Sequence, residues 1–336
     1  MTGADGKLTP PIGRDDLAGI NGIVMLAAGT SHYASMVARY WIESIARVPV
    51  ACEVASEYRY RNPVTSAYTT AIAISQSGES LDTLMAMRHA GEAGLQTIGL
   101  VNVDGSTIAR EADIVMPTRA GPEIGVASTK AFTAQLTALL SFSIALAEAR
   151  SEITAARRDE LHNHIQRLPS LVGKTLGLFD QIRPVAHSLM GARSALYLGR
   201  DVLFPVALEG ALKLKELSYI HAEGFASGEM KHGPIALIEK GLPVIALLAA
   251  DEVMGKAASN LQEASARGAR IILVTEECAA DTVDFADTTI TVPDVDPVLA
   301  PLLLTIPVQI LAYLTAFEKG TDVDQPRNLA KSVTVE

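Results

Sequence analysis

The loop at residues 75–80 has the clearest chemical pattern in the sequence, Ser-Gln-Ser-Gly-Glu-Ser. A β-rich run, residues 70–75, leads into it, and a helical pattern begins near Leu81. Such a turn suits a phosphate group, because free N–H groups at a helix start, a glycine that allows close approach and several hydroxyls converge on one point. An ordinary helix cap by one serine is the simpler alternative, but a cap needs only one hydroxyl. We predict a phosphate site formed by Ser75, Gln76, Ser77 and Ser80.

A second turn, Gly29-Thr30-Ser31, also joins a strand pattern to a helix pattern. In a parallel sheet it would lie beside the serine loop, so Thr30 and Ser31 could reach the same ligand. Glu79 is expected to point away from the anion. We predict no nucleotide site, because the sequence lacks the G-x-G-x-x-G pattern, and Gly173-Lys174-Thr175 lacks the first glycine of a phosphate-binding P-loop.

Three ionisable residues, Glu209, Lys213 and Glu216, share one face of an otherwise apolar helical segment, residues 207–217. A carboxylate whose pKa is raised by partial burial could move a proton between C1 and C2 of a sugar near neutral pH. An ion pair on the surface of the helix is the alternative, and these residues alone do not decide between the two.

Other candidate residues lie in a loop and in the tail. His232, within residues 227–234, could open a sugar ring by acid–base transfer, although a lone histidine is more often structural. Lys331, five residues from the end, could form an imine with a ketose if the tail folds into the site, but tails usually fray. His162 and His164 are expected to be solvated, and we predict neither a metal site nor a cofactor.

Short β-rich runs alternate with helix-length segments, which predicts an α/β fold with two doubly wound, mostly parallel sheets. The second half repeats the pattern of the first, so two lobes with ligands at the carboxyl ends of their strands are expected. The expected organisation is a lead-in at 1–21, a first domain at 22–150, a helical connector at 151–188, a second domain at 189–319 and a tail at 320–336. Expected strands are 23–28, 48–54, 70–75, 97–102, 113–117, 195–199, 219–222, 243–248, 270–275 and 288–292, and expected helices include 35–46, 81–93 and 133–147.

The composition restricts the classes of partner. A formal net charge of -10 disfavours nucleic acid and anionic membrane surfaces, and two cysteines fit a reducing cytoplasm. The uncharged stretch 297–317 is long enough to span a membrane, but three prolines and several polar residues interrupt it. We predict a helix that is buried or lies in a subunit interface.

Four separate segments together resemble a known family. They are residues 75–80, 121–133, 207–216 and 322–336, and the likeness extends over residues 22–336. They closely resemble the isomerase half of the glucosamine-6-phosphate synthases, enzymes built from two sugar isomerase (SIS) domains that make glucosamine 6-phosphate from fructose 6-phosphate. Two departures are Ala28, where the family often has cysteine, and Ser80, where threonine is usual.

The resemblance implies a role for each matching residue. Ser31 and the serine loop would bind the sugar phosphate, Val126, Ser128 and Ala330 would line the sugar site, and Glu216 would transfer the C1/C2 proton beside Lys213. Lys331 would form the imine, and His232 of a partner subunit would open the ring. The resemblance thus implies a homodimer with a shared active site.

The family's glutaminase domain has no counterpart in these residues, so we expect no glutamine hydrolysis by this chain, and ammonia from a separate glutaminase domain or subunit. A truncated form of a longer enzyme is compatible with this. Two rival functions remain at this point. One is a stand-alone glucosamine-6-phosphate deaminase of the SIS type, and the other is a non-enzymatic sugar-phosphate sensor, which would need an attached DNA-binding module.

Overall fold

The computed structural model describes residues 10–332 of the chain. These residues form two compact units. Unit 1 comprises residues 10–163 together with 329–332, and unit 2 comprises residues 164–328. The boundary falls inside helix α7 (Ala155–Leu176), within the stretch expected to be a connector.

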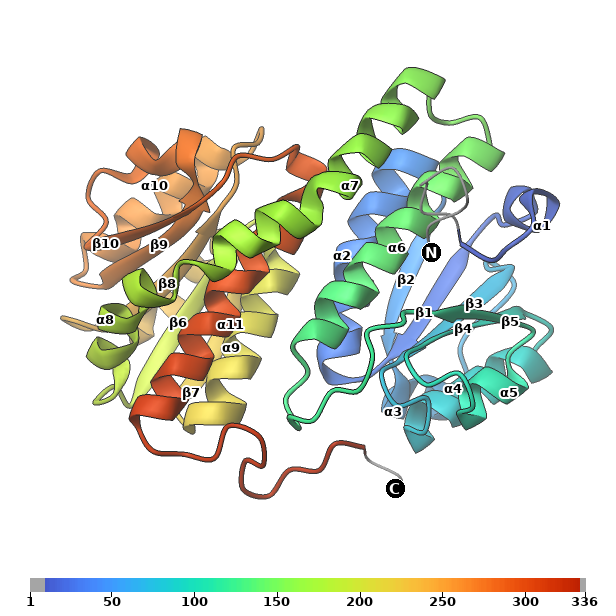
Figure 1. Cartoon of the computed structure of the whole chain (residues 1–336), viewed down its shortest axis with the longest axis horizontal. Helices are drawn as coiled ribbons and strands as arrows, with labels where there is room; N and C mark the ends of the chain where they lie inside the picture. Colours follow the sequence, from blue (N-terminus) through green and yellow to red (C-terminus); the bar gives the residue numbers. More distant parts are fainter. Residues whose placement is uncertain (1–9, 333–336) are drawn as a thin grey trace. The chain divides into compact units, whose positions relative to one another are not determined.

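Unit 1 is built on a five-stranded parallel sheet in the order β2-β1-β3-β4-β5 (Figure 1). The interior strands β1 and β3 are buried along their whole length, because helices cover both faces of the sheet. Helices α2 and α6 pack together on one face, and α3, α4 and α5 lie on the other (Figure 1). The strands are β1 (Ile23–Ala27), β2 (Val50–Val54), β3 (Thr70–Ser75), β4 (Gln96–Val101) and β5 (Ile114–Pro117); the helices are α1 (Arg14–Ala18), α2 (Gly29–Trp41), α3 (Ala55–Tyr58), α4 (Leu81–Glu92), α5 (Thr107–Glu111) and α6 (Lys130–Ala149).

Unit 2 repeats this plan with the strand order β7-β6-β8-β9-β10, also parallel. Helix α11 packs against both α8 and α9 on one face, and α10 contacts β8 and β9 (Figure 1). The strands are β6 (Ser194–Gly199), β7 (His221–Ala226), β8 (Pro243–Leu248), β9 (Arg270–Glu276) and β10 (Thr288–Val292); the helices are α8 (Phe179–Leu189), α9 (Leu203–Ser218), α10 (Met254–Ser265) and α11 (Ala300–Glu318).

The repeat extends to a side-chain contact at the same place in both sheets. Asp113 accepts a hydrogen bond from the N–H of Thr97 at 2.8 Å, at the start of β4. Asp287 accepts one from the N–H of Ile271 at 2.7 Å, at the start of β9. The predicted α/β fold with two parallel sheets is thus confirmed, and the two halves share details of hydrogen bonding as well as topology.

Within residues 10–332, two helices are long and apolar enough to cross a membrane by length and composition, namely Lys130–Ala149 and Pro297–Glu318. Their most apolar windows are 67% and 83% buried within the protein. Helix α11 packs on α8 and α9, so its apolar surface is covered by its own unit. Both are therefore core helices, which agrees with the prediction of a buried helix at 297–317.

Several local predictions were wrong. The expected strand 219–222 begins at His221, because Tyr219 adopts the left-handed conformation that ends α9. The first long helix begins at Gly29 rather than near residue 35. His162 is 7% exposed and not solvated, since it lies on the buried side of α7 next to Leu161, which is 1% exposed.

Candidate functional site

The serine loop forms a turn between β3 and α4 whose hydroxyls accept hydrogen bonds from the loop backbone. Ser75 accepts from the N–H of Gly78 at 3.0 Å, and Ser77 accepts from the N–H of Glu79 at 3.1 Å. Ser80 stands at the N-cap of α4, but its side chain makes no capping hydrogen bond and instead accepts from the hydroxyl of Thr83 at 3.3 Å. Ser80 thus leaves the first N–H groups of α4 uncapped, and uncapped N–H groups at a helix start can bind an anion.

Gly78 allows the loop to close. Its φ is +65°, and a Cβ atom there would lie 2.0 Å from the Oγ of Ser106. The neighbouring Glu79 accepts a hydrogen bond from the N–H of Thr107 at 2.8 Å, at the start of α5, and hydrogen bonding to Thr107 lowers the pKa of this exposed carboxyl. The carboxylate of Glu79 is thereby tied to α5, as expected for a group that should not oppose a phosphate.

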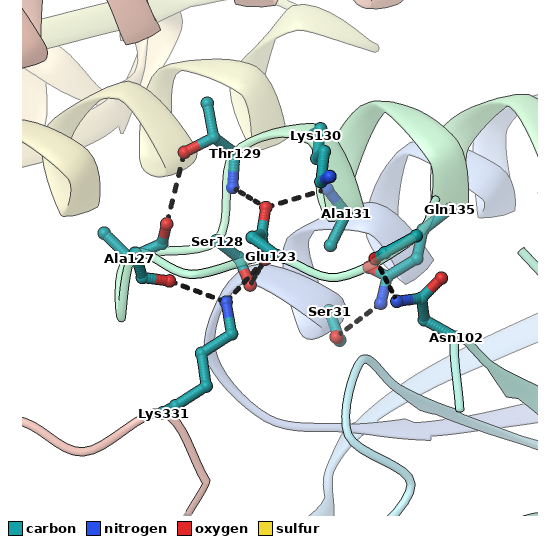
Figure 2. A network of polar contacts seen from close by, with 12 residues as sticks. Ser31, Asn102, Glu123, Ala127, Ser128, Thr129, Lys130, Ala131, Gln135 and Lys331 are labelled. Atoms are coloured by element: carbon teal, nitrogen blue, oxygen red, sulfur yellow. Dashed lines mark hydrogen bonds and ion pairs between the residues drawn. The ribbon is translucent and has the colours of Figure 1, made fainter. Parts of the chain in front are cut away.

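The second turn lies at the neighbouring strand end, because β1 pairs with β3 and Ala27 is opposite Ile74. Ser31, in the first turn of α2, accepts a hydrogen bond from the side-chain amide of Gln135 at 2.9 Å (Figure 2). Thr30 and Ser31 are both half-buried. Unit 1 therefore gathers the hydroxyls of both turns at the carboxyl edge of one sheet, which is where doubly wound folds bind ligands.

The side chain of Lys331 points toward the loop that precedes α6 (Figure 2). Its Nζ lies 2.6 Å from Oε2 of Glu123 and 2.8 Å from the carbonyl oxygen of Gly125. Glu123 is 6% exposed, and its other oxygen accepts from the N–H groups of Thr129 at 2.9 Å and Ala131 at 3.1 Å. Lys331 is thus held by defined contacts within unit 1 and is partly desolvated, whereas a frayed tail would leave it without fixed partners.

The pKa of Glu123 reflects these contacts. Burial alone would raise it, but the hydrogen bonds from Lys331 and from the two backbone N–H groups outweigh burial and hold it below its usual value. Glu123 was not among the predicted site residues. The available signal was a carboxylate between Pro122 and Gly125, directly before a long apolar helix.

The tail also contacts the serine loop. The hydroxyl of Ser332 lies 3.2 Å from that of Ser77. Ser128 donates a long hydrogen bond of 3.4 Å to Glu123, Val126 is half-buried in the same loop, and Ala330 is exposed. The residues predicted to bind the phosphate and the lysine predicted to react therefore belong to one neighbourhood in unit 1.

A second cluster lies on α9 in unit 2. Lys213, 2% exposed, lies 2.5 Å from Glu216 and 3.6 Å from Glu209, which is fully buried. Burial lowers the pKa of Lys213, but the two carboxylates outweigh it and raise the pKa above its usual value. The alternative of an ion pair on the helix surface is therefore wrong. Glu216, with 21% of its side chain exposed, is the member of the cluster that solvent reaches most easily.

His232 joins neither cluster. It ends a 3-10 turn (Ser227–His232) before Gly233, whose φ is +144°, and its side chain is exposed. No hydrogen bond or ion pair links it to residues 10–332, so its predicted role stays a prediction.

The second sheet does not repeat the phosphate loop. After β8 the chain continues through Ala249, Ala250, Asp251 and Glu252, which carry no hydroxyl. Asp251 is partly buried, and burial raises its pKa. This acidic turn is unsuited to a phosphate, so the two similar units differ in the ligand that their strand ends can accept.

Comparisons with known proteins agree with the geometry. The SIS domain pattern matches residues 16–145 and 188–319. The chain is 52% identical over 323 residues to the glutamine–fructose-6-phosphate aminotransferase (isomerizing) of Brucella abortus biovar 1 (strain 9-941), covering 96% of this chain and 53% of that protein. For the corresponding protein of Zymomonas mobilis subsp. mobilis (strain ATCC 31821 / ZM4 / CP4), identity is 50% over 333 residues, with 99% and 55% covered.

A solved structure shows the same relationship in three dimensions. The C-terminal domain of glucosamine-fructose-6-phosphate aminotransferase from Francisella tularensis superposes with a TM-score of 0.92 at 40% identity, covering 97% of this chain and 92% of that domain. The chain spans about half the length of the curated relatives that it matches. It belongs to the SIS domain family, as a double-SIS chain of the kind that forms the isomerase half of the isomerizing glutamine–fructose-6-phosphate aminotransferases.

Proposed function

We propose that this chain acts on fructose 6-phosphate as a sugar-phosphate isomerase and aminotransferase that yields glucosamine 6-phosphate. The serine loop and Ser31 hold the phosphate. The observation that supports the proposal most is the position of Lys331 in unit 1. Lys331 binds Glu123, and the adjacent Ser332 lies within hydrogen-bonding distance of Ser77 in the serine loop. A phosphate anchor and an amine nucleophile in one neighbourhood suit a phosphorylated ketose better than a simple binding role.

Once the sugar ring is open, the covalent chemistry takes place at Lys331. Its Nζ lies 2.6 Å from Oε2 of Glu123, so Glu123 is the nearest group to accept a proton before the nitrogen attacks the C2 carbonyl. Attack forms a C–N bond, and water leaves as the imine forms. Ammonia then adds to the imine carbon and displaces the amine of Lys331. Glu216 moves a proton from C1 to C2 of the released imine, with the charge of Lys213 beside it, which gives glucosamine 6-phosphate. His232, from a partner subunit in a cytoplasmic homodimer, opens the sugar ring first.

A direct assay tests this function. The purified chain is incubated with fructose 6-phosphate, with and without ammonium, and glucose 6-phosphate and glucosamine 6-phosphate are measured. We expect isomerisation without ammonium, and borohydride should trap the sugar on Lys331, as read by mass spectrometry. Lys331→Ala should abolish both, while Lys174→Ala, which changes an exposed lysine of α7, should not.

The direction of the nitrogen chemistry is tested separately. Glucosamine 6-phosphate is supplied as substrate, and free ammonia is measured. Ammonia release without any amination in the reverse assay would favour a deaminase. Sugar-phosphate binding with no turnover and no trapped lysine would overturn the enzymatic proposal in favour of a sensor.

A further inference from the structure

The segment that precedes Lys331 is fastened to the end of α9. The hydroxyl of Thr321 donates to the carbonyl oxygen of Leu217 at 2.7 Å. Asp322 then accepts hydrogen bonds from the N–H groups of Asp324 at 3.0 Å and Gln325 at 2.9 Å, which closes a tight turn. The tail therefore leaves unit 2 along a defined path.

Tyr219 is an unusual residue for its position. It ends α9 with φ +61°, where helices usually place glycine because a Cβ atom is unfavourable in the left-handed region. A large aromatic side chain at such a point indicates a contact that offsets the backbone strain. The side chain of Tyr219 makes two.

Both contacts are with Arg327. The hydroxyl oxygen of Tyr219 accepts a hydrogen bond from the backbone N–H of Arg327 at 2.8 Å. The guanidinium carbon of Arg327 lies 4.1 Å from the centre of the Tyr219 ring, a close cation–π contact. One side chain thus holds both the backbone and the side chain of a single tail residue.

Tyr219 and Arg327 are each close in sequence to a residue of the proposed reaction. It lies three residues after Glu216, and Arg327 lies four residues before Lys331. A spacer of three residues has few conformations once its start is fixed, so holding Arg327 in place reduces the conformational freedom that Lys331 loses when it binds Glu123.

We propose that Tyr219 is a positioning residue, which fastens the tail at Arg327 so that Lys331 is delivered to its seat beside Glu123. The expected effect of Tyr219 on turnover rests on the proposed function. Its expected effect on the order of the tail rests on the two contacts with Arg327 alone. Tyr219 acts through Arg327 and needs no contact with the substrate.

Two variants of Tyr219 separate positioning from a merely structural role. Tyr219→Phe keeps the ring and removes the acceptor oxygen, so kcat should fall about fivefold while the KM for fructose 6-phosphate stays unchanged. Tyr219→Gly also removes the ring but relieves the backbone strain, so its Tm should equal or exceed that of the parent while kcat falls further. The matched control is Tyr60→Phe, which removes an exposed hydroxyl 2.7 Å from Arg59 in unit 1 and should change neither parameter.

Amide hydrogen exchange supplies a readout that needs no turnover. We expect exchange at Arg327 and at residues 329–332 to accelerate several-fold in both Tyr219 variants and not in Tyr60→Phe. Unchanged exchange at these residues would overturn the fastening, whether or not the chain is an enzyme. Faster exchange with unchanged kcat would overturn positioning and leave the proposed function intact, whereas failure of the proposed function would show as no turnover in the parent chain.

Discussion

The ammonium of Lys213 lies between two carboxylates in the interior of unit 2. Replacing it by an apolar side chain, Lys213→Met, would leave the fully buried Glu209 without its counter-charge. We expect the free energy of unfolding to fall by about 3–5 kcal/mol, since breaking a buried ion pair costs far more than breaking an exposed one. Urea denaturation measures this.

The neighbouring Lys215 provides the control, because it lies on the exposed side of the same helix. Lys215→Met should change the free energy of unfolding by no more than about 0.5 kcal/mol. Equal losses in the two variants would mean that the charges of α9 are not organised as a buried cluster.

Glu123 gives the attachment of Lys331 a pH dependence. Its pKa in the folded chain lies below the unfolded value of about 4.3, so its contribution to stability is fully present above that pH and is lost as pH falls through the folded pKa. We expect the Tm difference between the parent and Glu123→Gln to be largest above pH 5 and to shrink on acidification below about pH 4. A difference that grows toward low pH would contradict the ion pair.

Local chemistry explains which of these residues could be predicted from the sequence. The hydroxyls of residues 75–80 are positioned by a strand, a glycine and a helix start that adjoin them in the chain, so their gathering was predictable. The partner of Lys331 lies 208 residues away, and no local pattern could identify Glu123. Burial of Glu209 was likewise undecided, because a face of α9 becomes interior only when α11 packs on it.

At the scale of elements, the turn between β3 and α4 depends on Gly78. Gly78→Ala would place a Cβ 2.0 Å from the Oγ of Ser106 in a left-handed conformation, which forces the loop to move. We expect sugar-phosphate affinity to fall at least tenfold, because the loop hydroxyls and the start of α4 would no longer converge. Calorimetric titration with fructose 6-phosphate tests this.

Gly105→Ala is the control, since a Cβ there meets nothing within 4 Å. It should bind the sugar phosphate as the parent does. Normal affinity in Gly78→Ala would place the phosphate elsewhere.

The elements themselves were predicted well where periodicity is strong and poorly at their ends. Strands β3, β8 and β10 have the expected bounds. The expected strand at 219–222 was wrong at its start. Tyr219 and Ile220 are residue types that favour strands, and they do not indicate that the helix continues to Ser218 and ends with Tyr219 in the left-handed conformation. Tyr219 also accepts a hydrogen bond from Arg327 in the tail, and a contact between residues 108 positions apart leaves no local pattern in the sequence.

At the scale of the whole molecule, two similar units carry different strand-end loops. Fructose 6-phosphate should therefore slow amide hydrogen exchange at residues 75–80 and 329–332 of unit 1, and leave the acidic turn at residues 249–253 of unit 2 unchanged, because carboxylates there repel a phosphate. Exchange measured by mass spectrometry on the intact chain tests this. Protection of residues 249–253 would contradict the assignment of the phosphate to unit 1.

The repeat of two parallel sheets was predictable because β-rich runs and helical segments alternate twice along the chain. The expected division into a second domain and a separate tail did not foresee that residues 329–332 belong to unit 1. Composition and periodicity report on residues that are close in sequence. Residues 329–332 belong to unit 1 because Lys331 and Ser332 contact residues that are distant in sequence.

That assignment has a consequence for synthesis on the ribosome. Domains generally fold as units in the order in which they emerge, so the sheet of unit 1 can form while unit 2 is still being translated. Lys331, the proposed nucleophile, is encoded about 170 residues after the rest of unit 1 and follows the whole of unit 2. Under the proposed function, a nascent chain can therefore bind a sugar phosphate before Lys331 has been made, but it cannot form the imine until then.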